Sequence, residues 1–381
     1  MNCRNQPKKR SLKVGIDFHV VDGKFQGSRS HVIELFSRVI AISPEIEFFL
    51  FLDKLELLPQ ISPAFAAENV HAIRMAAADP LRRYYWQLPM LARRCELDVI
   101  HTQYVLPWPV ACKRVVTIHD ILFDSNPEYF TPIFVARSRI LMRRAARHAD
   151  HVFTVSNFSR GEICRAFAVP EQKVSVIHNG ADFHRFASPD REDGAILERR
   201  GLSREGYILS VGRLEPRKNH EGLIRAYALL DKSAPPLILV GQRDFRFEGV
   251  FRAIRELGLG DRVHVFGDVQ DAELPALYRN AVVFAFPTFA EGFGMPAVEA
   301  MAAGTPVLTS NAGALTELVG PGGAEIIDPH NIEDIAAALR TLLSDPALRA
   351  RLGAAGRERA RQFSWESSAK ILHDYYLSLS G

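Results

Sequence analysis

The chain has 381 residues, of which 47% are hydrophobic and 24% are charged, and its formal net charge is +3. This composition is ordinary for a soluble globular protein, and it excludes a disordered or low-complexity chain. The length is too great for one ordinary hydrophobic core and indicates two domains of about 150–200 residues each.

The cysteines and the chain start bear on cellular location. The four cysteines are scattered, with no C-x-x-C pair and no nearby histidine cluster: Cys3, Cys95, Cys112 and Cys164. This disfavours a disulfide framework or structural zinc and favours a reducing cytoplasm. The first residues are basic but lack an apolar stretch long enough for a signal peptide, and no run approaches the ~18–20 apolar residues of a membrane-spanning helix. We therefore expect a cytoplasmic protein.

Positive charge is concentrated in the first half. Residues 1–185 hold 25 Lys and Arg against 18 Asp and Glu, whereas the remainder holds 22 against 26. The basic groups are Lys8–Arg10, Arg82–Arg83, Arg93–Arg94, and Arg137, Arg139, Arg143, Arg144 and Arg147. They form either a solvated helix face or a surface for anionic lipid head groups or a lipid-diphosphate acceptor on the inner face of the plasma membrane. Nucleic acid is a poorer partner, because we find no recognised binding motif and no strongly basic domain.

The first half alternates between strand and helix patterns. Leu12 to Phe18 is predicted to be a buried strand, followed by a glycine-containing loop over 22–27 and a helix from about Ser30 to Ala41. Further short strands are predicted at Phe48–Leu52, Asp98–His101, Arg114–Ile118 and Val152–Val155. Helices separate most of them, which indicates a parallel sheet covered on both faces.

The alternation pauses in the polar stretch 188–205 and then restarts with four apolar segments, which begin at Tyr207, Leu237, Val263 and Ala281. Three of these segments end in glycine, as expected where strands open onto a ligand crevice at their carboxyl ends. We predict an α/β protein with two Rossmann-like domains facing each other across a cleft. The predicted boundaries are 1–187 and 188–363.

The run Ala290–Val307 (AEGFGMPAVEAMAAGTPV) follows the last strand. Pro296 is predicted to begin a helix and Gly304 to end it. Glu291 then lies on the loop before the helix, and Glu299 on its first turn. Glycines let backbone N–H groups approach a ligand, and a helix start favours an anion, so the run could hold a phosphorylated, hydroxyl-rich molecule. The simpler interpretation is that Glu299 complements the helix dipole and Glu291 is a solvated acid.

This run resembles the signature of the retaining, nucleotide-sugar-dependent glycosyltransferases of family 4, which have the GT-B fold. Further segments resemble landmarks of the same family, in the family's order: Thr117–Asp120 (TIHD), Thr154–Ser159 (TVSNFS), Val176–Asp182 (VIHNGAD) and Val211–Asn219 (VGRLEPRKN). The resemblance spans roughly residues 12 to 375. It implies an N-terminal acceptor domain, a C-terminal nucleotide-sugar donor domain, and a last helix over 364–381 that crosses back to the first domain.

The resemblance also assigns roles within the run. Glu299 holds the nucleotide ribose, accepting hydrogen bonds from two hydroxyls. Glu291 lies beside the transferred sugar, where orienting hydroxyls and stabilising ring charge both remain open. The backbone N–H groups of Phe293, Gly294 and Met295 contact sugar hydroxyls or phosphate.

The departing diphosphate needs a divalent metal or fixed cations to stabilise its charge. The chain has no Asp-x-Asp pair, but Arg213 and Lys218 follow the strand that ends at Gly212, with Glu215 as the nearby carboxylate in the sequence. Arginine binds phosphate oxygens bidentately and lysine supplies a mobile charge. A solvated loop is the alternative. We expect phosphate binding without a metal or other cofactor.

His119 follows a predicted strand, and the resemblance places it near the hydroxyls of the donor sugar, although a lone histidine is more often structural. Asp120 either orients the imidazole or caps the next turn. The glycine loop departs from the family's usual Gly-Gly-x-Gly-Arg and reads QGSRS over Gln26–Ser30. Gly27 is expected to approach the diphosphate. Arg29 stands where a glycine is usual. Its side chain could contact a donor phosphate or an acceptor phosphate, and the sequence leaves both alternatives open.

The aromatic run Tyr84–Trp86 beside Arg82–Arg83 has three interpretations: a sugar-binding surface, a membrane interface, or a helix face packed in the core.

Taken together, the sequence predicts a metal-independent, retaining hexosyltransferase. GDP-mannose is the preferred donor, because Ile118–Phe123 and Asn126–Phe130 resemble bacterial polysaccharide mannosyltransferases, while UDP-glucose and other donors remain open. The expected acceptor is a lipid-linked oligosaccharide or polysaccharide precursor. Alternatives are a non-hydrolysing sugar-nucleotide epimerase, a non-enzymatic two-lobed sugar-binding protein, and a transferase-like protein without activity.

Overall fold

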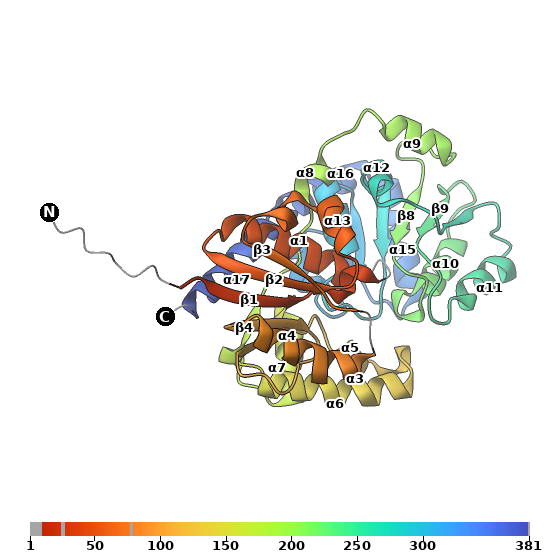
Figure 1. Ribbon diagram of the computed structural model, residues 1–381. Coiled ribbons are helices and arrows are strands. Elements are labelled where there is room, and N and C mark those ends of the chain that lie inside the picture. The colour runs from red at the N-terminus through yellow and green to blue at the C-terminus, as the bar shows by residue number, and fades with distance from the viewer. Residues whose placement is uncertain (1–9, 24–26, 77–78, 380–381) are drawn as a thin grey trace.

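A computed structural model describes residues 10–23, 27–76 and 79–379, which form two α/β domains (Figure 1). Lys8, Lys9 and Cys3, together with Gln26 of the glycine loop, lie outside the described residues. Each domain is built around one parallel sheet. The strand order is β3-β2-β1-β4-β5-β6-β7 in the first sheet and β10-β9-β8-β11-β12-β13 in the second.

The strands of the first sheet are β1 Leu12–Asp17, β2 Ile46–Leu52, β3 Val70–Arg74, β4 Val99–Gln103, β5 Lys113–Thr117, β6 His151–Thr154 and β7 Val174–Val176. Those of the second are β8 Ile208–Val211, β9 Leu237–Val240, β10 Val263–Phe266, β11 Val283–Phe286, β12 Val307–Ser310 and β13 Glu325–Ile327. Parallel sheets are covered on both faces, which is why the central strands are continuous apolar runs.

The helices of the first domain are α1 Gly27–Ile42, α2 Leu58–Ile61, α3 Pro80–Arg82, α4 Leu88–Arg94, α5 Leu122–Ser125, α6 Pro132–His148 and α7 Asn157–Phe167. The next group is α8 Phe183–Ala187, α9 Asp193–Arg199, α10 His220–Ala228, α11 Glu248–Glu256, α12 Leu274–Arg279 and α13 Met295–Ala303. The last are α14 Leu315–Val319, α15 Ile332–Ser344, α16 Pro346–Ala360 and α17 Trp365–Ser378.

All nine strands predicted from the sequence are present, and four further strands of the described chain were missed. Three of the missed strands, β3, β7 and β13, lie at the edges of their sheets, where burial is incomplete and the apolar pattern is weak. The fourth, β12, is buried but only four residues long.

The polar stretch 188–205 was predicted to interrupt the regular structure, and this was wrong in part, because it contains α9. Ile196 and Leu197 are buried on one face of this helix, and Asp193 pairs with Arg279 of α12 at 2.5 Å. The amphipathic pattern of a helix this short is hidden by its charged exposed residues. Phe186 of α8 and Leu197 both pack in the core of the second domain. The boundary at 187/188 stays a prediction.

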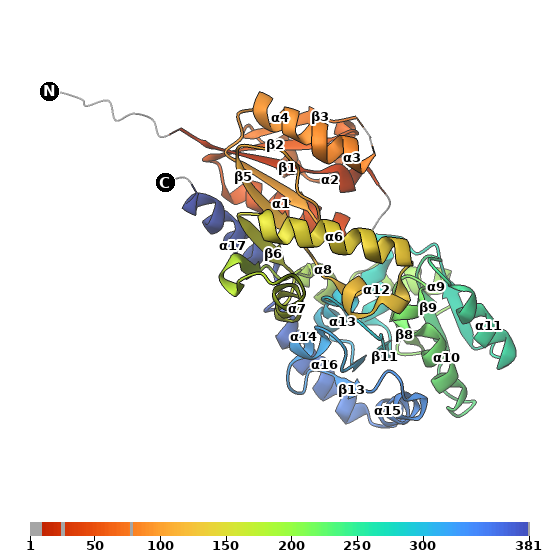
Figure 2. The same cartoon turned by 90° about the horizontal axis from the view of Figure 1, so that it is seen from below.

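The last helix returns to the first domain, as predicted. The views in Figures 1 and 2 show α17 lying along α1 beside the first sheet. Trp365, Leu372 and Tyr376 are buried there with α1 and the strands β1 and β2. Burial of apolar area stabilises the fold by roughly 25 cal/mol per Å². Because the last helix of the chain packs in the core of the first domain, α17 ties the two domains together.

The carboxyl ends of the two sheets face each other. Ser156, after β6, donates to the Gly292 carbonyl at 2.7 Å, and Tyr129 stacks on Phe289 with ring centroids 5.8 Å apart. The Glu317 carboxylate accepts hydrogen bonds from two backbone N–H groups at the start of α7. Residues that follow strands in both sheets therefore meet at one interface, as the two-domain α/β prediction required.

Within the described ranges, no helix is both long enough and apolar enough to cross a bilayer.

Candidate active site

The loop after β8 places two cations in the interior. Arg217 and Lys218 form the short 3₁₀ helix η7 (Pro216–Lys218), and both side chains are nine-tenths buried. Asn219 holds this loop in place, because its side-chain amide donates to the carbonyls of Pro287 and Pro329 at 2.9 and 2.8 Å. Its positive φ of 55° suits an asparagine. The loop is thus fixed before any ligand arrives.

Glu291 is the acid that these cations surround. Lys218 Nζ lies 2.6 Å and Arg217 Nη1 3.0 Å from the same oxygen, Glu291 Oε1. The Thr288 hydroxyl donates to that oxygen at 3.2 Å. Glu215 takes a further bond from Arg217 at 2.6 Å, so the group holds two cations and two carboxylates. The sequence-predicted residues Lys218 and Glu291 therefore contact each other directly.

The pKa values describe a charged, balanced group. Burial acts to raise the pKa of Glu291, but Arg217 and Lys218 outweigh it and hold that pKa below its ordinary value. Burial lowers the pKa of Lys218, partly offset by Glu291. Glu291 therefore stays ionised, and Lys218 is a buried cation whose charge is shared with a carboxylate.

Arg213 lies apart from this group. Its side chain is 49% exposed and it forms an ion pair with Asp244, while Glu215 is 3.8 Å away. The expectation that Glu215 is its only nearby carboxylate was wrong, because Asp244 follows the adjacent strand β9 and reaches Arg213 only in the folded chain. Arg213 also approaches the first domain, since its charge opposes the burial that raises the pKa of Tyr104.

Glu299 occupies a separate position on α13. Because α13 begins at Met295, Glu299 is its fifth residue and lies on the second turn, not on the first as predicted. Pro296 is the second helical residue rather than the first. The Tyr278 hydroxyl donates to Glu299 Oε2 at 2.9 Å, and burial raises the pKa of Glu299 to about 7. Dipole complementation is thus a poor explanation for this acid.

The glycines before α13 are required by close approaches. A Cβ on Gly292 would lie 2.5 Å from the Cβ of Asp120 in the opposite domain, and Gly294 has φ +108°. The Phe293 ring is buried against Phe363, so only the Phe293 backbone is available to a ligand. Met295 packs against the cores of both domains. Contact between these backbone N–H groups and a ligand stays a prediction.

His119 faces this region from the first domain and is buried. Its Nε2 lies 2.9 Å from Gln103 Oε1, and since an amide oxygen only accepts, Nε2 carries the proton and Nδ1 is left as an acceptor. Burial, with smaller contributions from His31 and His101, lowers its pKa well below the ordinary value, so the imidazole is neutral. Gln103 is therefore the partner of the imidazole. Asp120 instead accepts from the Leu122 N–H at 3.2 Å, which fits the capping alternative.

Asp120 completes the contact between the domains. Burial raises its pKa, and the charges of Arg217, Glu291 and Lys218 all act on it. The neutral histidine and Asp120 of one domain thus lie opposite the ionised group of the other.

Gly27 and Arg29 begin α1. Gly27 is exposed, and a Cβ there would meet no atom within 4 Å, so crowding by the protein does not require this glycine. Arg29 Nε donates to the Val21 carbonyl at 3.3 Å. The contact of Gly27 with a diphosphate stays a prediction. Of Tyr84–Trp86, Tyr84 is buried in the core, whereas Tyr85 and Trp86 are exposed, so the core interpretation holds for one of the three rings.

In the part of the chain that the structure describes, no three His, Cys, Asp or Glu side chains are grouped in a way that could hold a metal ion.

Comparison with known proteins identifies the family. Residues 57–185 match the family model described as Glycosyltransferase Family 4, and residues 196–359 match the model for glycosyl transferases group 1. The chain is 31% identical over 362 residues to the O-antigen chain mannosyltransferase B of Escherichia coli, covering 90% of this chain and 93% of that protein. This chain belongs to the family 4 (group 1) glycosyltransferases.

Two other proteins extend the comparison. The D-inositol 3-phosphate glycosyltransferase of Streptomyces avermitilis is 29% identical, over 93% of this chain and 83% of that protein. The structure of Anabaena HepE in complex with UDP-glucose superposes with a TM-score of 0.77 at 21% identity, covering 96% of this chain and all of that chain. The second likeness shows the shared GT-B fold.

Several residues of this glycosyltransferase that shape the site were missed by sequence reasoning. Arg217 was not among the residues assigned to the diphosphate, although it is buried and donates to the Ala290 carbonyl at 2.6 Å. Gln103, Tyr278 and Asp244 come from other elements and touch the predicted residues only through the fold. For Gln103, a usable signal was present, since it is a polar residue just after the strand predicted at Asp98–His101; we see no such signal for Tyr278.

Proposed function

We propose that this glycosyltransferase transfers a hexose from a nucleoside-diphosphate sugar to a hydroxyl of a lipid-linked oligosaccharide or polysaccharide precursor, with retention of the anomeric configuration. The preferred donor is GDP-mannose. Its support is the 31% identity to the O-antigen chain mannosyltransferase over almost the whole length of both chains. UDP-glucose and inositol phosphate acceptors are the competing assignments, named by the other relatives.

The observation that carries the proposal is the buried group of Arg217, Lys218 and Glu291, opposite neutral His119. In the reaction, the anomeric C–O bond to the diphosphate breaks, a bond to the acceptor oxygen forms, and the acceptor proton is released to the diphosphate or to solvent. Fixed cations stabilise the developing negative charge without reorganisation.

The residues divide these tasks. Lys218, with Arg213 released from Asp244, contacts the diphosphate. Glu291 is held where it can accept hydrogen bonds from sugar hydroxyls or stabilise positive ring charge. His119 Nδ1 accepts a hydrogen bond from a further sugar hydroxyl, and Glu299 binds the ribose. We expect no metal to be needed, since these cations take its place.

A thermal-shift panel of GDP, UDP, ADP and their sugars tests the donor. A ligand at ~100 times its dissociation constant stabilises the folded state by ~2.7 kcal/mol, so the cognate nucleotide should be distinct. Transfer with that donor should persist in EDTA, and the product anomer, read by NMR, should match the donor. Abolition by EDTA with rescue by Mn²⁺ would contradict metal independence. An epimerised donor in the absence of acceptor would favour the epimerase.

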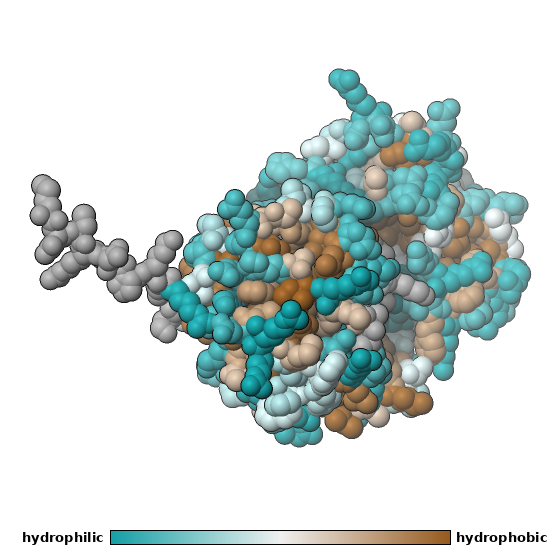
Figure 3. Space-filling view, in the orientation of Figure 1, coloured by the Kyte–Doolittle hydropathy of each residue, from teal (hydrophilic) through white to brown (hydrophobic). Residues whose placement is uncertain are grey.

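We also propose that the first domain docks on an anionic membrane surface, where a lipid-linked acceptor would reside. Large apolar side chains are exposed on α3, on the helical turn Arg83–Gln87 that follows it, and on α6, at exposed fractions of 69% for Leu81, 54% for Trp86, 83% for Ile133 and 69% for Ile140. Figure 3 shows apolar surface along the lower margin of the molecule, over α3 and α6.

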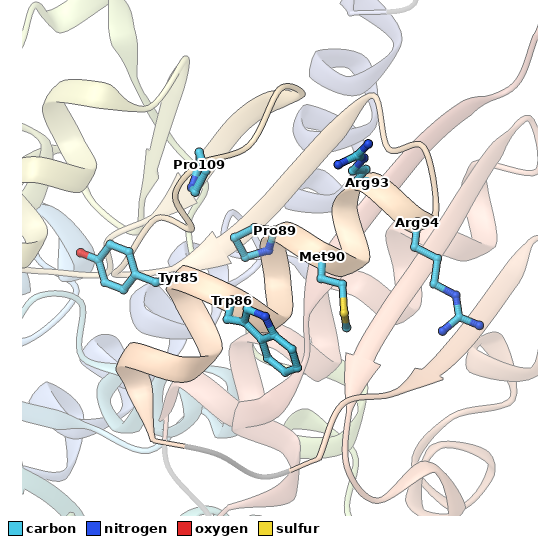
Figure 4. Close-up of a pocket in the computed structure, with 7 residues that line it drawn as sticks. All are labelled: Tyr85, Trp86, Pro89, Met90, Arg93, Arg94 and Pro109. Carbon is cyan, nitrogen blue, oxygen red and sulfur yellow. The ribbon is translucent and has the colours of Figure 1, made fainter.

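Arginines border this apolar surface. A shallow pocket of about 620 Å³ is lined by Tyr85, Trp86, Pro89, Met90, Arg93, Arg94 and Pro109 (Figure 4). Figure 4 shows the Trp86 ring beside Met90, with Arg94 extended on the same side. On α6, Ile133, Arg137, Ile140 and Arg144 recur at helical spacing on the exposed face. Aromatic and apolar side chains with neighbouring arginines suit the boundary between lipid head groups and acyl chains.

Vesicle sedimentation tests this surface. Binding should rise with the phosphatidylglycerol content of the vesicles and weaken as salt screens the charges. Trp86→Ser with Ile140→Ser should reduce binding, while Leu257→Ser, an exposed apolar residue of the second domain, should not. Equal binding to neutral and anionic vesicles would reject the proposal.

A further inference from the structure

A histidine–carboxylate pair stands at the end of β1 and takes no part in the site described above. His19 Nδ1 lies 2.7 Å from Asp17 Oδ1, and the His19 backbone N–H donates to the same oxygen at 3.3 Å. Asp17 is fully buried, whereas the His19 side chain is 24% exposed. A buried carboxylate thus holds a histidine that reaches the surface.

The surroundings of Asp17 hold its carboxylate in place. Its first oxygen, Oδ1, takes both contacts from His19, and the Tyr84 hydroxyl bonds to the same carboxylate. The Tyr84 ring is close by, since burial together with the Asp17 carboxylate raises the pKa of Tyr84 well above its ordinary value. Burying a carboxylate costs free energy unless it is paired, and here His19 supplies the pairing group.

The pair lies on the same sheet edge as His119. Strand β1 pairs with β4 in parallel, with Ile16 opposite His101, so Asp17 lies level with the carboxyl end of β4. That end carries Gln103, the partner of His119. Asp17 and His19 therefore stand at the carboxyl edge of the acceptor-side sheet, beside the strand whose polar end positions His119.

We infer that His19, oriented by Asp17, binds the acceptor: its Nε2 accepts a hydrogen bond from the hydroxyl group of a glycoside that receives the sugar. Asp17 accepts a hydrogen bond from His19 Nδ1–H, which fixes the tautomer and leaves Nε2 as the acceptor atom of a side chain that is 24% exposed. Asp17 is a positioning residue. The inference rests on the proposed function and adds to it the residue that selects the acceptor.

The test separates acceptor use from donor use. A panel of octyl glycosides (α-mannoside, β-glucoside and β-N-acetylglucosaminide) serves as acceptor with the donor found in the thermal-shift panel. His19→Ala should lower kcat/KM for the acceptor at least tenfold. Donor hydrolysis in the absence of acceptor and the Kd of the nucleoside diphosphate should stay within twofold of wild type.

Two further variants probe the pairing. His71→Ala removes another histidine–carboxylate pair of the same domain, with Glu47 at 3.4 Å on the outer strands, and should leave acceptor use unchanged. Asp17→Asn should weaken acceptor use less than His19→Ala, and the double variant should be no worse than His19→Ala alone, because the two residues act as a unit. A structural role for Asp17 would instead give additive losses and a loss of donor hydrolysis.

The outcomes decide between the two proposals. A wild-type protein that neither binds nor hydrolyses any nucleotide sugar refutes the proposed function. If wild type transfers and His19→Ala matches it, or loses donor hydrolysis in parallel with transfer, the inference is overturned and the proposed function stands. Donor hydrolysis by wild type with no transfer to any octyl glycoside also overturns the inference, because the inference states that His19 binds a glycoside hydroxyl.

Discussion

The two facing sheet edges differ in the ionisation of their buried side chains. At the edge of the second domain, Arg217, Lys218 and Glu291 are buried, ionised and bonded to one another. At the edge of the first domain, His31 and His119 are buried and neutral, since burial lowers the pKa of His31 to about 4 and that of His119 well below its usual range. One edge therefore suits an anion and the other suits uncharged hydroxyls.

In the proposed function, one interface holds a diphosphate and a sugar side by side, and this difference in charge fits that arrangement. An unpaired buried charge destabilises the fold strongly, and in the second domain the buried cations are paired with carboxylates of the same domain. If Lys218 and Arg213 bind the diphosphate as proposed, it must compete with Glu291 for Lys218 and with Asp244 for Arg213. The predictions that follow alter the charge balance on one edge at a time.

The largest effect is expected from removing a cation. Lys218→Ala and Arg213→Ala should each lower transfer about 10²–10³-fold, as for the loss of one preorganised donor to a developing anion. Only Lys218→Ala should also lower the unfolding temperature, because Glu291 then loses a buried partner, whereas Arg213 is half exposed. Steady-state kinetics and thermal melts measure both. Lys232→Ala, an exposed lysine, is the control; transfer within tenfold of wild type in Lys218→Ala would exclude a role at the phosphate.

A similar loss of transfer, without a loss of nucleotide affinity, is expected for Glu291→Gln. Transfer should fall by about 10²-fold. The free energy of unfolding should fall by about 3–5 kcal/mol, since two buried cations lose a counter-charge. The nucleoside diphosphate should bind as tightly as before or more tightly, because Lys218 is released to it. Calorimetric titration beside denaturant melts gives both values, with Glu248→Gln on the surface as the control. Weaker nucleotide binding would show that Glu291 contacts the nucleotide.

A smaller, pH-dependent effect is expected at Glu299. The pKa of Glu299 is raised to about 7, so its carboxylate form is lost as pH falls below 7. If this carboxylate accepts hydrogen bonds from two ribose hydroxyls as proposed, nucleotide affinity should drop about tenfold between pH 8 and pH 6. Folding stability runs the other way: an acid with a raised pKa holds its proton in the folded state, so its contribution is largest below pH 4.5 and is lost as pH rises to about 7. Titrations at several pH values measure the first effect. Glu299→Gln should bind the nucleotide about tenfold more weakly at pH 8, and its nucleotide affinity should no longer change with pH. If the variant keeps the pH dependence, another group causes it.

The smallest effect concerns the Arg213–Asp244 pair. Asp244→Asn should tighten nucleoside diphosphate binding by up to about fivefold, because exposed ion pairs contribute only about 0.2–1 kcal/mol and Arg213 no longer has to leave one. The gain should vanish in an Arg213→Ala background, which calorimetry on the double variant reads directly. An equal gain without Arg213 would mean that Asp244 acts through its own repulsion of the phosphates.

Much of the fold followed from the sequence because central parallel strands are apolar on both faces and stand out as continuous runs. The GT-B architecture, the return of the last helix and the family assignment were all confirmed. Edge strands and α9 were missed, since half-buried elements share their composition with loops. The assigned roles of Glu291, Glu299 and His119 stay predictions, although the structure brings Glu291 and Lys218 into contact.

The sequence by itself determined which residue types stand at the strand ends: Arg213 and Lys218 after β8, Glu291 after β11, and His119 after β5. Backbone geometry makes this possible, because the carboxyl ends of parallel strands share one edge. Only the tertiary structure decided the pairings, such as Lys218 with Glu291 and His119 with Gln103. Which side chains far apart in the chain become partners depends on their burial and on the distance between them, and local sequence determines neither quantity. The ionisation of each group follows from those partners.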